Sequence, residues 1–148
     1  MKALIQRVLQ ASVVVDGAVV GQIDHGLLVF LAVIRGDGPE QVDKMVGKVA
    51  GMRIFPDGEG KMNRSVRDVG GSVLVVSQFT LAAELNKGYR PSFSQAADPQ
   101  TARKIMETFC ENLRHQSLNV ATGRFGADMK VHLINDGPVT FWLDFPGN

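Results

Sequence analysis

Gly26-Leu27-Leu28-Val29-Phe30-Leu31-Ala32-Val33-Ile34 is a nearly unbroken apolar run, and it restricts the fold more than any other stretch of this sequence. A run of this length that is rich in Val and Leu is typical of a strand buried on both faces. Val73-Leu74-Val75-Val76 is a second, shorter run of the same kind. We therefore expect a sheet whose inner strands include these two runs.

Further strands are expected where apolar residues alternate or run together: residues 2–9, 12–15, 18–23, 72–80, 128–134 and 139–145. Asp16-Gly17 is a hairpin turn between the second and third of these segments, and Pro56-Asp57-Gly58 marks another turn region.

Two segments have helical periodicity instead. Pro39 stands at or near the first position of one helix, whose apolar residues Val42, Met45, Val46 and Val49 recur at i, i+3, i+4 and i+7. Asp98-Pro99 is an N-cap and first-turn pair for the second helix. The apolar stripe of that helix consists of Ala102, Ile105, Met106, Phe109 and Leu113.

The predicted elements are six or seven strands and two helices. Because the helices do not alternate with the strands, a doubly wound fold is disfavoured. We expect an α+β fold with a curved, mostly antiparallel, barrel-like sheet, in one domain that spans residues 1–148.

The composition is that of a globular protein, with 148 residues, 45% of them hydrophobic, and a formal net charge of +1. A pI of about 7.9 neither demands nor excludes a nucleic-acid partner, so a nucleic-acid binder would need a local basic patch. Cys110 is the single cysteine, and its place beside Phe109 predicts a small buried hydrophobe. The start of the chain becomes polar too soon for a secretory signal, and no apolar run approaches the ~18 residues of a membrane span. We expect a soluble, cytoplasmic protein.

Several kinds of chemistry have no motif here. The sequence contains no Cys pair and no HExxH, and His25, His115 and His132 are scattered, so we expect no metal. No GxGxxG follows a strand and opens a helix, so a dinucleotide site is disfavoured. The segment Gly58-Glu59-Gly60-Lys61 lacks the spacing of a phosphate-binding P-loop and is typical of a hairpin turn. We therefore expect no cofactor.

Two segments at strand ends carry the polar groups from which sites are built. Ser77-Gln78-Phe79-Thr80-Leu81 follows the second apolar run, and Asn135-Asp136-Gly137-Pro138-Val139-Thr140 joins the last two strands. Ser77 and Thr80 are possible nucleophiles, but no base stands beside them in the sequence, and hydroxyls at strand ends are common. Because proline cannot donate to a sheet, Gly137-Pro138 must be a turn, a bulge or an edge, and glycine there allows close approach to the backbone.

Taken together, these segments resemble the D-aminoacyl-tRNA deacylase family over essentially the whole chain. Ser77–Leu81 and Asn135–Thr140, in this order and spacing, are the most specific. The other matching segments are Ala3–Val8, Ser12–Gly17, Arg53–Phe55, Lys61–Asn63, Gly70–Ser72, Arg90–Phe93, Thr122–Phe125 and Ala127–Met129.

The resemblance implies a homodimer with active sites at the interface, which hydrolyses the ester of D-aminoacyl-tRNA and also of glycyl-tRNA. It implies that Ser77, Gln78, Phe79 and Thr80 line the pocket and that Phe125 and Met129 hold the terminal adenosine. It further implies that a cis Gly137-Pro138 from the partner captures the substrate's amino group and excludes an L side chain, with Arg7 nearby.

The resemblance also bears on the mechanism. Main-chain N–H groups at Phe79 and Thr80 would stabilise the oxyanion while the ribose hydroxyl assists water, so Thr80 positions rather than attacks. Two alternatives stay open: a related editing module that clears a wrong L-amino acid, and an RNA- or DNA-binding protein without catalysis.

Overall fold

The longest strand of the sheet, β1 (Lys2–Val15), pairs with three others in the computed structural model, which describes residues 1–147. Its first half pairs with β3 (Gly26–Ala32), its second half pairs with β2 (Ala18–Ile23), and β8 (Lys130–Asp144) runs along its other edge. Beyond β3 the sheet continues through β6 (Ser72–Ser77) to β7 (Asn119–Thr122), both joined in parallel. The pairings of β1 are antiparallel, so the sheet is mixed but mostly antiparallel, as expected.

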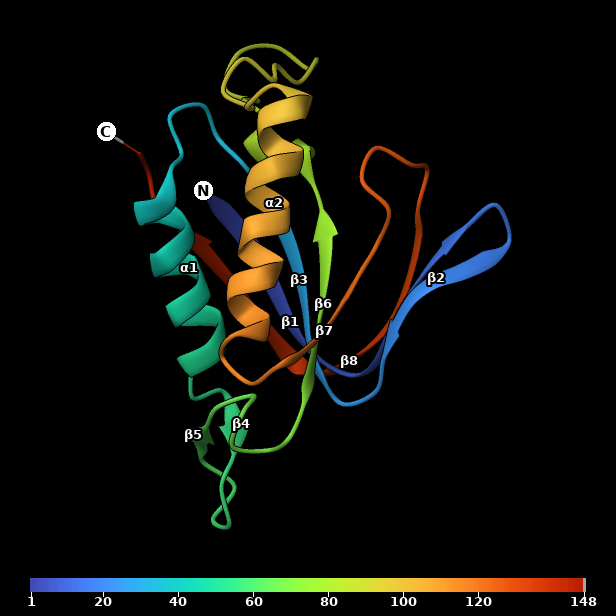
Figure 1. Cartoon of the computed structure of the whole chain (residues 1–148), viewed down its shortest axis with the longest axis vertical. Helices are drawn as coiled ribbons and strands as arrows, with labels where there is room; N and C mark the ends of the chain where they lie inside the picture. Colours follow the sequence, from blue (N-terminus) through green and yellow to red (C-terminus); the bar gives the residue numbers. More distant parts are fainter. Residues whose placement is uncertain (148) are drawn as a thin grey trace.

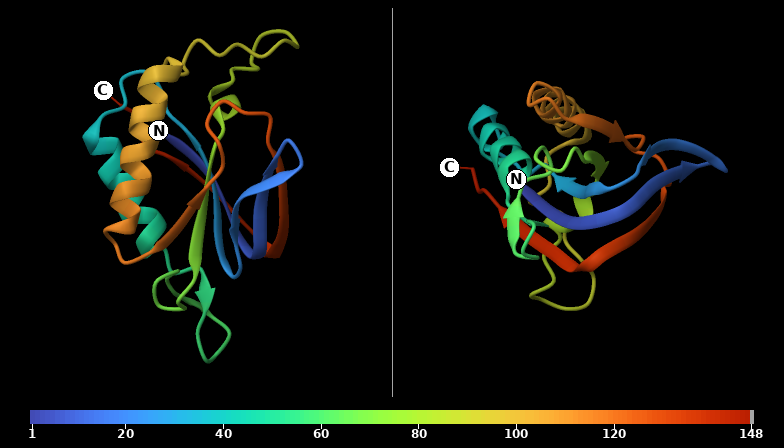
Figure 2. Two further views of the ribbon diagram at one scale, coloured as in Figure 1. Left: turned by 45° about the vertical axis from the view of Figure 1, so that its right-hand side comes forward. Right: turned by 90° about the horizontal axis from the view of Figure 1, so that it is seen from below.

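Alternate residues of β3 and β6 point into two separate cores, which is why both strands read as continuous apolar runs. Leu27, Val29 and Leu31 pack toward α1 (Pro39–Gly51) and α2 (Pro99–Arg114). Leu28 faces the opposite core, which is closed by the far end of β1, by β2 and by the first half of β8. Figures 1 and 2 show both helices on one side of the sheet, and the sheet curling upon itself on the other. The predicted α+β fold with a curved, barrel-like sheet is confirmed.

Both helices begin where their sequences predict. Pro39 is in the first turn of α1, and Gln41 accepts from the main-chain N–H of Gly38 at 2.9 Å. Asp98 caps α2, because its carboxylate accepts from the main-chain N–H of Thr101 at 2.9 Å. The hydrogen bonds from Thr101, the main-chain one first, hold the pKa of Asp98 below its ordinary value.

The hairpin turn at Asp16-Gly17 is also as expected, with positive φ at both residues, 50° and 78°. Around residue 60 the turn region forms a small separate hairpin from β4 (Phe55–Pro56) and β5 (Met62–Arg64).

Four details of the prediction were wrong. Residues 2–9 and 12–15 form one strand, and residues 128–134 and 139–145 belong to one strand interrupted by an irregular register. The strand expected over residues 72–80 ends at Ser77, and a 3-10 helix, η1 (Phe79–Ala82), follows it. The short strand β7 was missed, since four residues give too little periodicity to identify one.

In the part of the chain that the structure describes, no helix is both long enough and apolar enough to cross a membrane.

Candidate functional site

A cavity of about 490 Å³ opens at the carboxyl end of β6. Its walls come from the ends of β3 and β6, the start of α2 and the segment between β7 and β8. The lining residues are Leu31, Ala32, Val33, Val76, Ser77, Gln78, Phe79, Ala96, Ala97, Pro99, Ala102, Phe125, Gly126, Ala127, Asp128, Met129 and Val131. The structure thus brings together Ser77, Gln78 and Phe79 with Phe125 and Met129, which are far away in the sequence.

The chain leaves the sheet at Gln78, whose main-chain N–H donates to the Leu31 carbonyl at 2.8 Å. Phe79 begins η1, and the first N–H groups of a helix have no acceptor within it. The Gln78 amide donates to the Thr80 hydroxyl, and the Thr80 side chain does not line the cavity. The main-chain N–H groups of Phe79 and Thr80 therefore have no acceptor within η1, and Thr80 itself is not among the residues that line the cavity.

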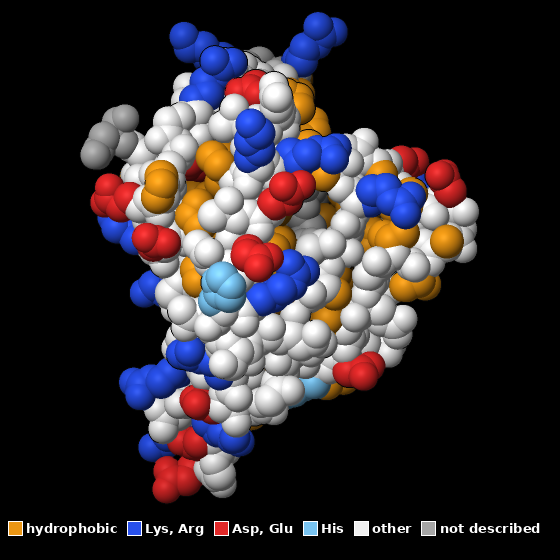
Figure 3. Space-filling view, in the orientation of Figure 1, with side chains coloured by type: hydrophobic (Ala, Val, Ile, Leu, Met, Phe, Trp, Pro, Cys, Tyr) orange, Lys and Arg blue, Asp and Glu red, His pale blue; other side chains and the backbone are white. Residues whose placement is uncertain are grey.

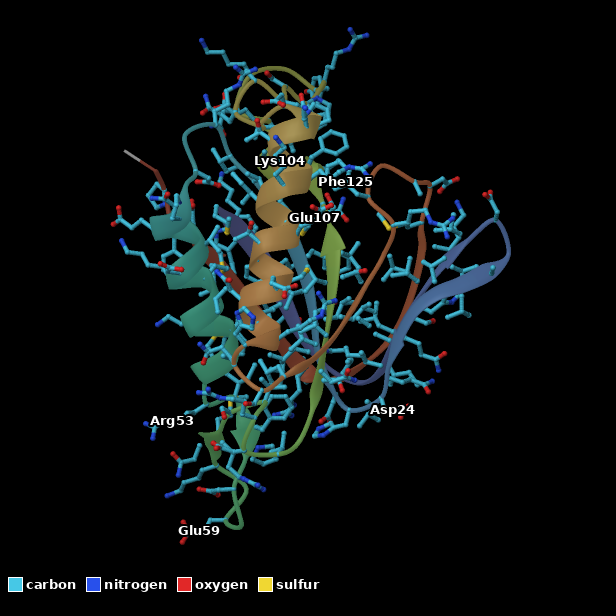
Figure 4. All side chains as sticks on the ribbon, in the orientation of Figure 1. Asp24, Arg53, Glu59, Lys104, Glu107 and Phe125 are labelled. Carbon is cyan, nitrogen blue, oxygen red and sulfur yellow. The ribbon has the colours of Figure 1, made fainter. Side chains whose placement is uncertain are left out.

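Phe125 and Met129 are held by packing rather than by strands. The guanidinium of Arg103, on α2, lies 5.1 Å from the ring centre of Phe125. Met129 packs against the core on the curled side of the sheet. A Cβ at Gly123 would lie 2.6 Å from the Met129 sulfur, so Gly123 leaves the room that this side chain occupies. Figure 4 shows Phe125 beside the upper part of α2, near Glu107 and Lys104.

No base stands beside the hydroxyls of the cavity. Of the described residues that line it, only Asp128 is ionisable, and its exposed carboxylate pairs with Lys130 at 3.0 Å. His132 lies in a different surface hollow, on the outside of β1 and β8. Within residues 1–147, no group of three or more His, Cys, Asp and Glu is arranged to hold a metal ion. Burial raises the pKa of the Cys110 thiol to about 11, so Cys110 is a buried hydrophobe, as predicted.

Asn135–Thr140 is a bulge within β8, one of the three alternatives that the sequence left open. The Gly137–Pro138 peptide bond is cis, as the resemblance implied. Arg7 holds this segment through its Nε, which donates to the Asp136 carbonyl at 2.9 Å and lies 3.2 Å from the Asp136 carboxylate. Arg7 Nη1 also donates to the Ile54 carbonyl at 2.7 Å.

Asn135 fixes the other side of the bulge. Its side-chain amide donates to the main-chain carbonyls of Arg7, at 2.9 Å, and Val139, at 3.1 Å. A Cβ at Gly137 would lie 2.2 Å from the Val139 nitrogen and 2.5 Å from the Asn135 side-chain oxygen. Only glycine fits this position in the observed conformation.

Within one chain, the two polar segments are far apart. The register places Ser77 beside Leu31, Leu31 beside Ala3, and the Gly137-Pro138 bulge opposite Arg7. Four residues along β1 and three steps between strands amount to roughly 20 Å measured along the sheet. Arg7, Gly137 and Pro138 are therefore not part of the cavity that Ser77 lines.

Most of the cavity wall was not identified from the sequence. Leu31–Val33, Ala96, Ala97 and Ala102 contribute apolar surface and no reactive group, so residue chemistry carries no signal for them. Only the register and the position of α2 place them at the site.

The family model and the curated relatives that match this chain carry the same description, a tRNA deacylase. The model of the D-Tyr-tRNA(Tyr) deacylase family matches residues 4–144. A D-aminoacyl-tRNA deacylase of Magnetococcus marinus is 62% identical over 147 residues, covering 99% of this chain and 97% of the relative. The D-aminoacyl-tRNA deacylase of Ruegeria pomeroyi is 59% identical over 144 residues, covering 97% and 99%. One from Escherichia coli is 56% identical over 143 residues, with the same coverage.

Two solved structures share the fold. One, described as a c-Myc DNA unwinding element binding protein, superposes with a TM-score of 0.93 at 40% identity, covering 99% of this chain and all of the other. The second, a probable eukaryotic D-amino acid tRNA deacylase, has a TM-score of 0.82 at 20% identity and covers 97% and 98%, which supports the fold alone. The family model over residues 4–144 and the relatives of 56–62% identity over nearly the whole chain show that the chain belongs to the D-Tyr-tRNA(Tyr) deacylase family.

Proposed function

We propose that this protein hydrolyses the ester between a D-amino acid and the terminal adenosine of tRNA, and acts in the cytoplasm. The observation that carries the proposal is the cavity itself. Its wall brings an aromatic ring and a thioether, Phe125 and Met129, together with Ser77, Gln78 and Phe79 at the end of β6. In this proposal the adenine ring contacts Phe125 and Met129, and the ester lies near the turn that follows Ser77.

The proposed mechanism uses the backbone rather than a side-chain nucleophile. Water attacks the ester carbonyl with help from the neighbouring ribose hydroxyl. The main-chain N–H groups of Phe79 and Thr80 stabilise the oxyanion that develops. The lack of an imidazole or a buried carboxylate in the described cavity wall supports this over direct attack by Thr80.

Thr80→Ala tests this mechanism. A positioning role for Thr80 leaves measurable hydrolysis of D-aminoacyl-tRNA, whereas a nucleophilic role leaves none. Complete loss of hydrolysis with tRNA binding intact would refute the backbone mechanism.

We further propose that the second half of each site comes from the partner in a homodimer. Gly137 and Pro138 are exposed, do not line the cavity of their own chain, and lie roughly 20 Å from Ser77 measured along the sheet, so we assign them to the cavity of the partner. Trp142 and Ile134, on the outward face of the same strand, are 49% and 47% exposed, which suits burial against a second copy. Across that interface, the main-chain oxygens of Gly137 and Pro138 would bind the substrate's amino group and exclude an L side chain.

Subunit complementation tests the shared site directly. Phe79→Pro removes one oxyanion donor at a first-turn position that tolerates proline, and Gly137→Ala perturbs the chirality-selecting segment. Each variant alone should lose most activity. Co-expressed in equal amounts, they form mixed dimers with one intact site, and activity should recover to about a quarter of wild type. If each site is built within one chain, no activity returns.

Chiral selection by shape predicts hydrolysis of many D-esters and of glycyl-tRNA, which has no side chain to exclude. Several D- and L-aminoacyl-tRNAs should be compared in one assay. Appreciable hydrolysis of an L-ester would contradict the proposal and favour an editing module for L-amino acids.

DNA binding is a second candidate, favoured only by the name of one structural neighbour at 40% identity. The net charge of +1 does not favour strong non-specific binding of duplex DNA. Duplex binding at a stated salt concentration, with no ester hydrolysis, would support this candidate instead.

A further inference from the structure

The loop between η1 and α2 carries an aromatic side chain that is not buried against any of residues 1–147. Tyr89 is 102% exposed, as much as in an extended peptide, and it stands between Lys87 and Arg90. Residues 85–97 contain these two cations and no Asp or Glu. A fully exposed ring adds nothing to the stability of the fold, so its presence at this position points to a role in binding.

The base of this loop is well anchored. Glu84 and Ser92 exchange two main-chain hydrogen bonds, of 2.8 and 3.1 Å. Phe93 packs edge-on against Phe79, with 5.0 Å between ring centres. Residues 84–92 therefore project from the molecule as an arm with a fixed base.

This arm stands at the mouth of the cavity. Phe79, which anchors Phe93, lines the cavity, and so do Ala96 and Ala97 at the far end of the loop. Figure 1 shows the loop beyond the start of α2, at the end of the molecule away from β4 and β5. Figure 3 shows Lys and Arg side chains gathered at that end with few acidic ones.

We propose that this arm binds the single-stranded 3′ end of the tRNA, with Tyr89 stacked on a base and with Lys87 and Arg90 on phosphates. The inference rests on the proposed function, because it assumes that the terminal adenosine occupies the cavity. The preceding nucleotides then leave through the mouth and pass the arm. An exposed ring between two cations is the pattern that binds single strands, and the one acidic residue of the arm, Glu84, stands at its base rather than beside Tyr89.

The reach of the arm agrees with this placement. The three residues from Ser92 to Tyr89 span at most about 10 Å, the length of about three stacked nucleotides. The arm therefore contacts the nucleotides immediately before the terminal adenosine. The low net charge of the chain makes such a local patch necessary for a polyanionic substrate.

The test compares two substrates, D-aminoacyl-tRNA and the same D-amino acid esterified to adenosine alone. Tyr89→Ala should lower kcat/KM for the tRNA substrate roughly tenfold, by loss of one stacked base, and leave the adenosine ester within about twofold. Tyr89→Phe keeps the ring and should behave as wild type. Equal losses on both substrates would instead make the arm a support of the cavity and overturn the inference.

The cations are tested by salt dependence. Lys87→Ala with Arg90→Ala should reduce the slope of log(kcat/KM) against log[salt] for the tRNA substrate by roughly 1.4, for two single-strand phosphates. Lys61→Ala with Arg53→Ala is the matched control, since both lie at the opposite end of the molecule (Figure 4 labels Arg53). An unchanged slope in the Lys87 and Arg90 variant would refute the phosphate contacts.

The two proposals fail in different ways. If wild type hydrolyses neither substrate, the proposed function fails, and binding of uncharged tRNA to wild type and to Tyr89→Ala still tests the arm. Weaker binding by Tyr89→Ala then supports the arm, and equal binding, or no binding by wild type, overturns it.

Discussion

Arg7 gives the sharpest test of how the Gly137-Pro138 segment is held. The Arg7 side chain is 12% exposed, and its guanidinium donates to the carbonyls of Ile54 and Asp136. It also pairs with the carboxylate of Asp136, whose side chain is 34% exposed. Each hydrogen bond from a charged donor contributes roughly 1.5–3 kcal/mol. Arg7→Met keeps the apolar stem and removes both hydrogen bonds, so the free energy of unfolding should fall by about 3–6 kcal/mol.

The ion pair is a smaller part of this loss, because the Asp136 carboxylate is partly in water. Asp136→Asn keeps the main-chain carbonyl and should cost about 1 kcal/mol or less. The coupling energy of the double variant should also be about 1 kcal/mol, which leaves most of the Arg7 effect to the carbonyls.

Urea unfolding at one fixed protein concentration measures these differences, since a dimer would make stability depend on concentration. Arg53→Met, an exposed arginine beside Ile54, is the matched control and should stay within about 0.5 kcal/mol of wild type. The reasoning fails if Arg7→Met is as mild as the control, or if the coupling to Asp136 accounts for nearly the whole loss.

Three further outcomes are expected. Gly26→Ala should lower the free energy of unfolding by at least about 3 kcal/mol, because its Cβ would lie 1.8 Å from the Ser72 carbonyl oxygen in the buried sheet. Gly47→Ala has open space around its Cβ and should be neutral or stabilising in the same urea unfolding series. Cys110 should resist iodoacetamide at pH 8 in the native protein and react once it is unfolded, since its pKa is about 11; rapid native alkylation would contradict its burial. The lowered pKa of Asp98 adds stability that is fully present above the pKa of the unfolded state, near 4, and is lost as the pH falls through the folded pKa. Asp98→Asn should therefore make the free energy of unfolding depend less on pH in the acid range. An unchanged pH dependence would contradict the capping role.

Local sequence was enough to predict the elements whose physics is local. Asp98-Pro99 supplies its own cap and first turn, and Asp16-Gly17 supplies the two positive φ values that its hairpin needs. The alternation of Leu27 and Leu28 between two cores explains why β3 could be identified as a strand buried on both faces. Each of these features depends on residues within a few positions of one another.

Prediction failed where distant partners decide the outcome. The sequence left Gly137-Pro138 as a turn, a bulge or an edge between two separate strands, and only pairing with β1 on both sides makes it a bulge within one strand. The run through Ser77 reads as a strand to Thr80, but the chain turns into η1 after the last pairing of β6 with β3, at Leu31. Pairing along β1 and β3 outweighs local preference in both places.

The sequence by itself determined the family, the two helices, the main strands and the two polar segments, because these follow from periodicity, turn chemistry and motif. Only the tertiary structure decided which of those groups meet. Register places Ser77, Phe125 and Met129 around one cavity and leaves Gly137-Pro138 roughly 20 Å away along the sheet, held by Arg7. Side-chain chemistry is a property of single residues, whereas a site depends on distances that strand pairing and helix packing set.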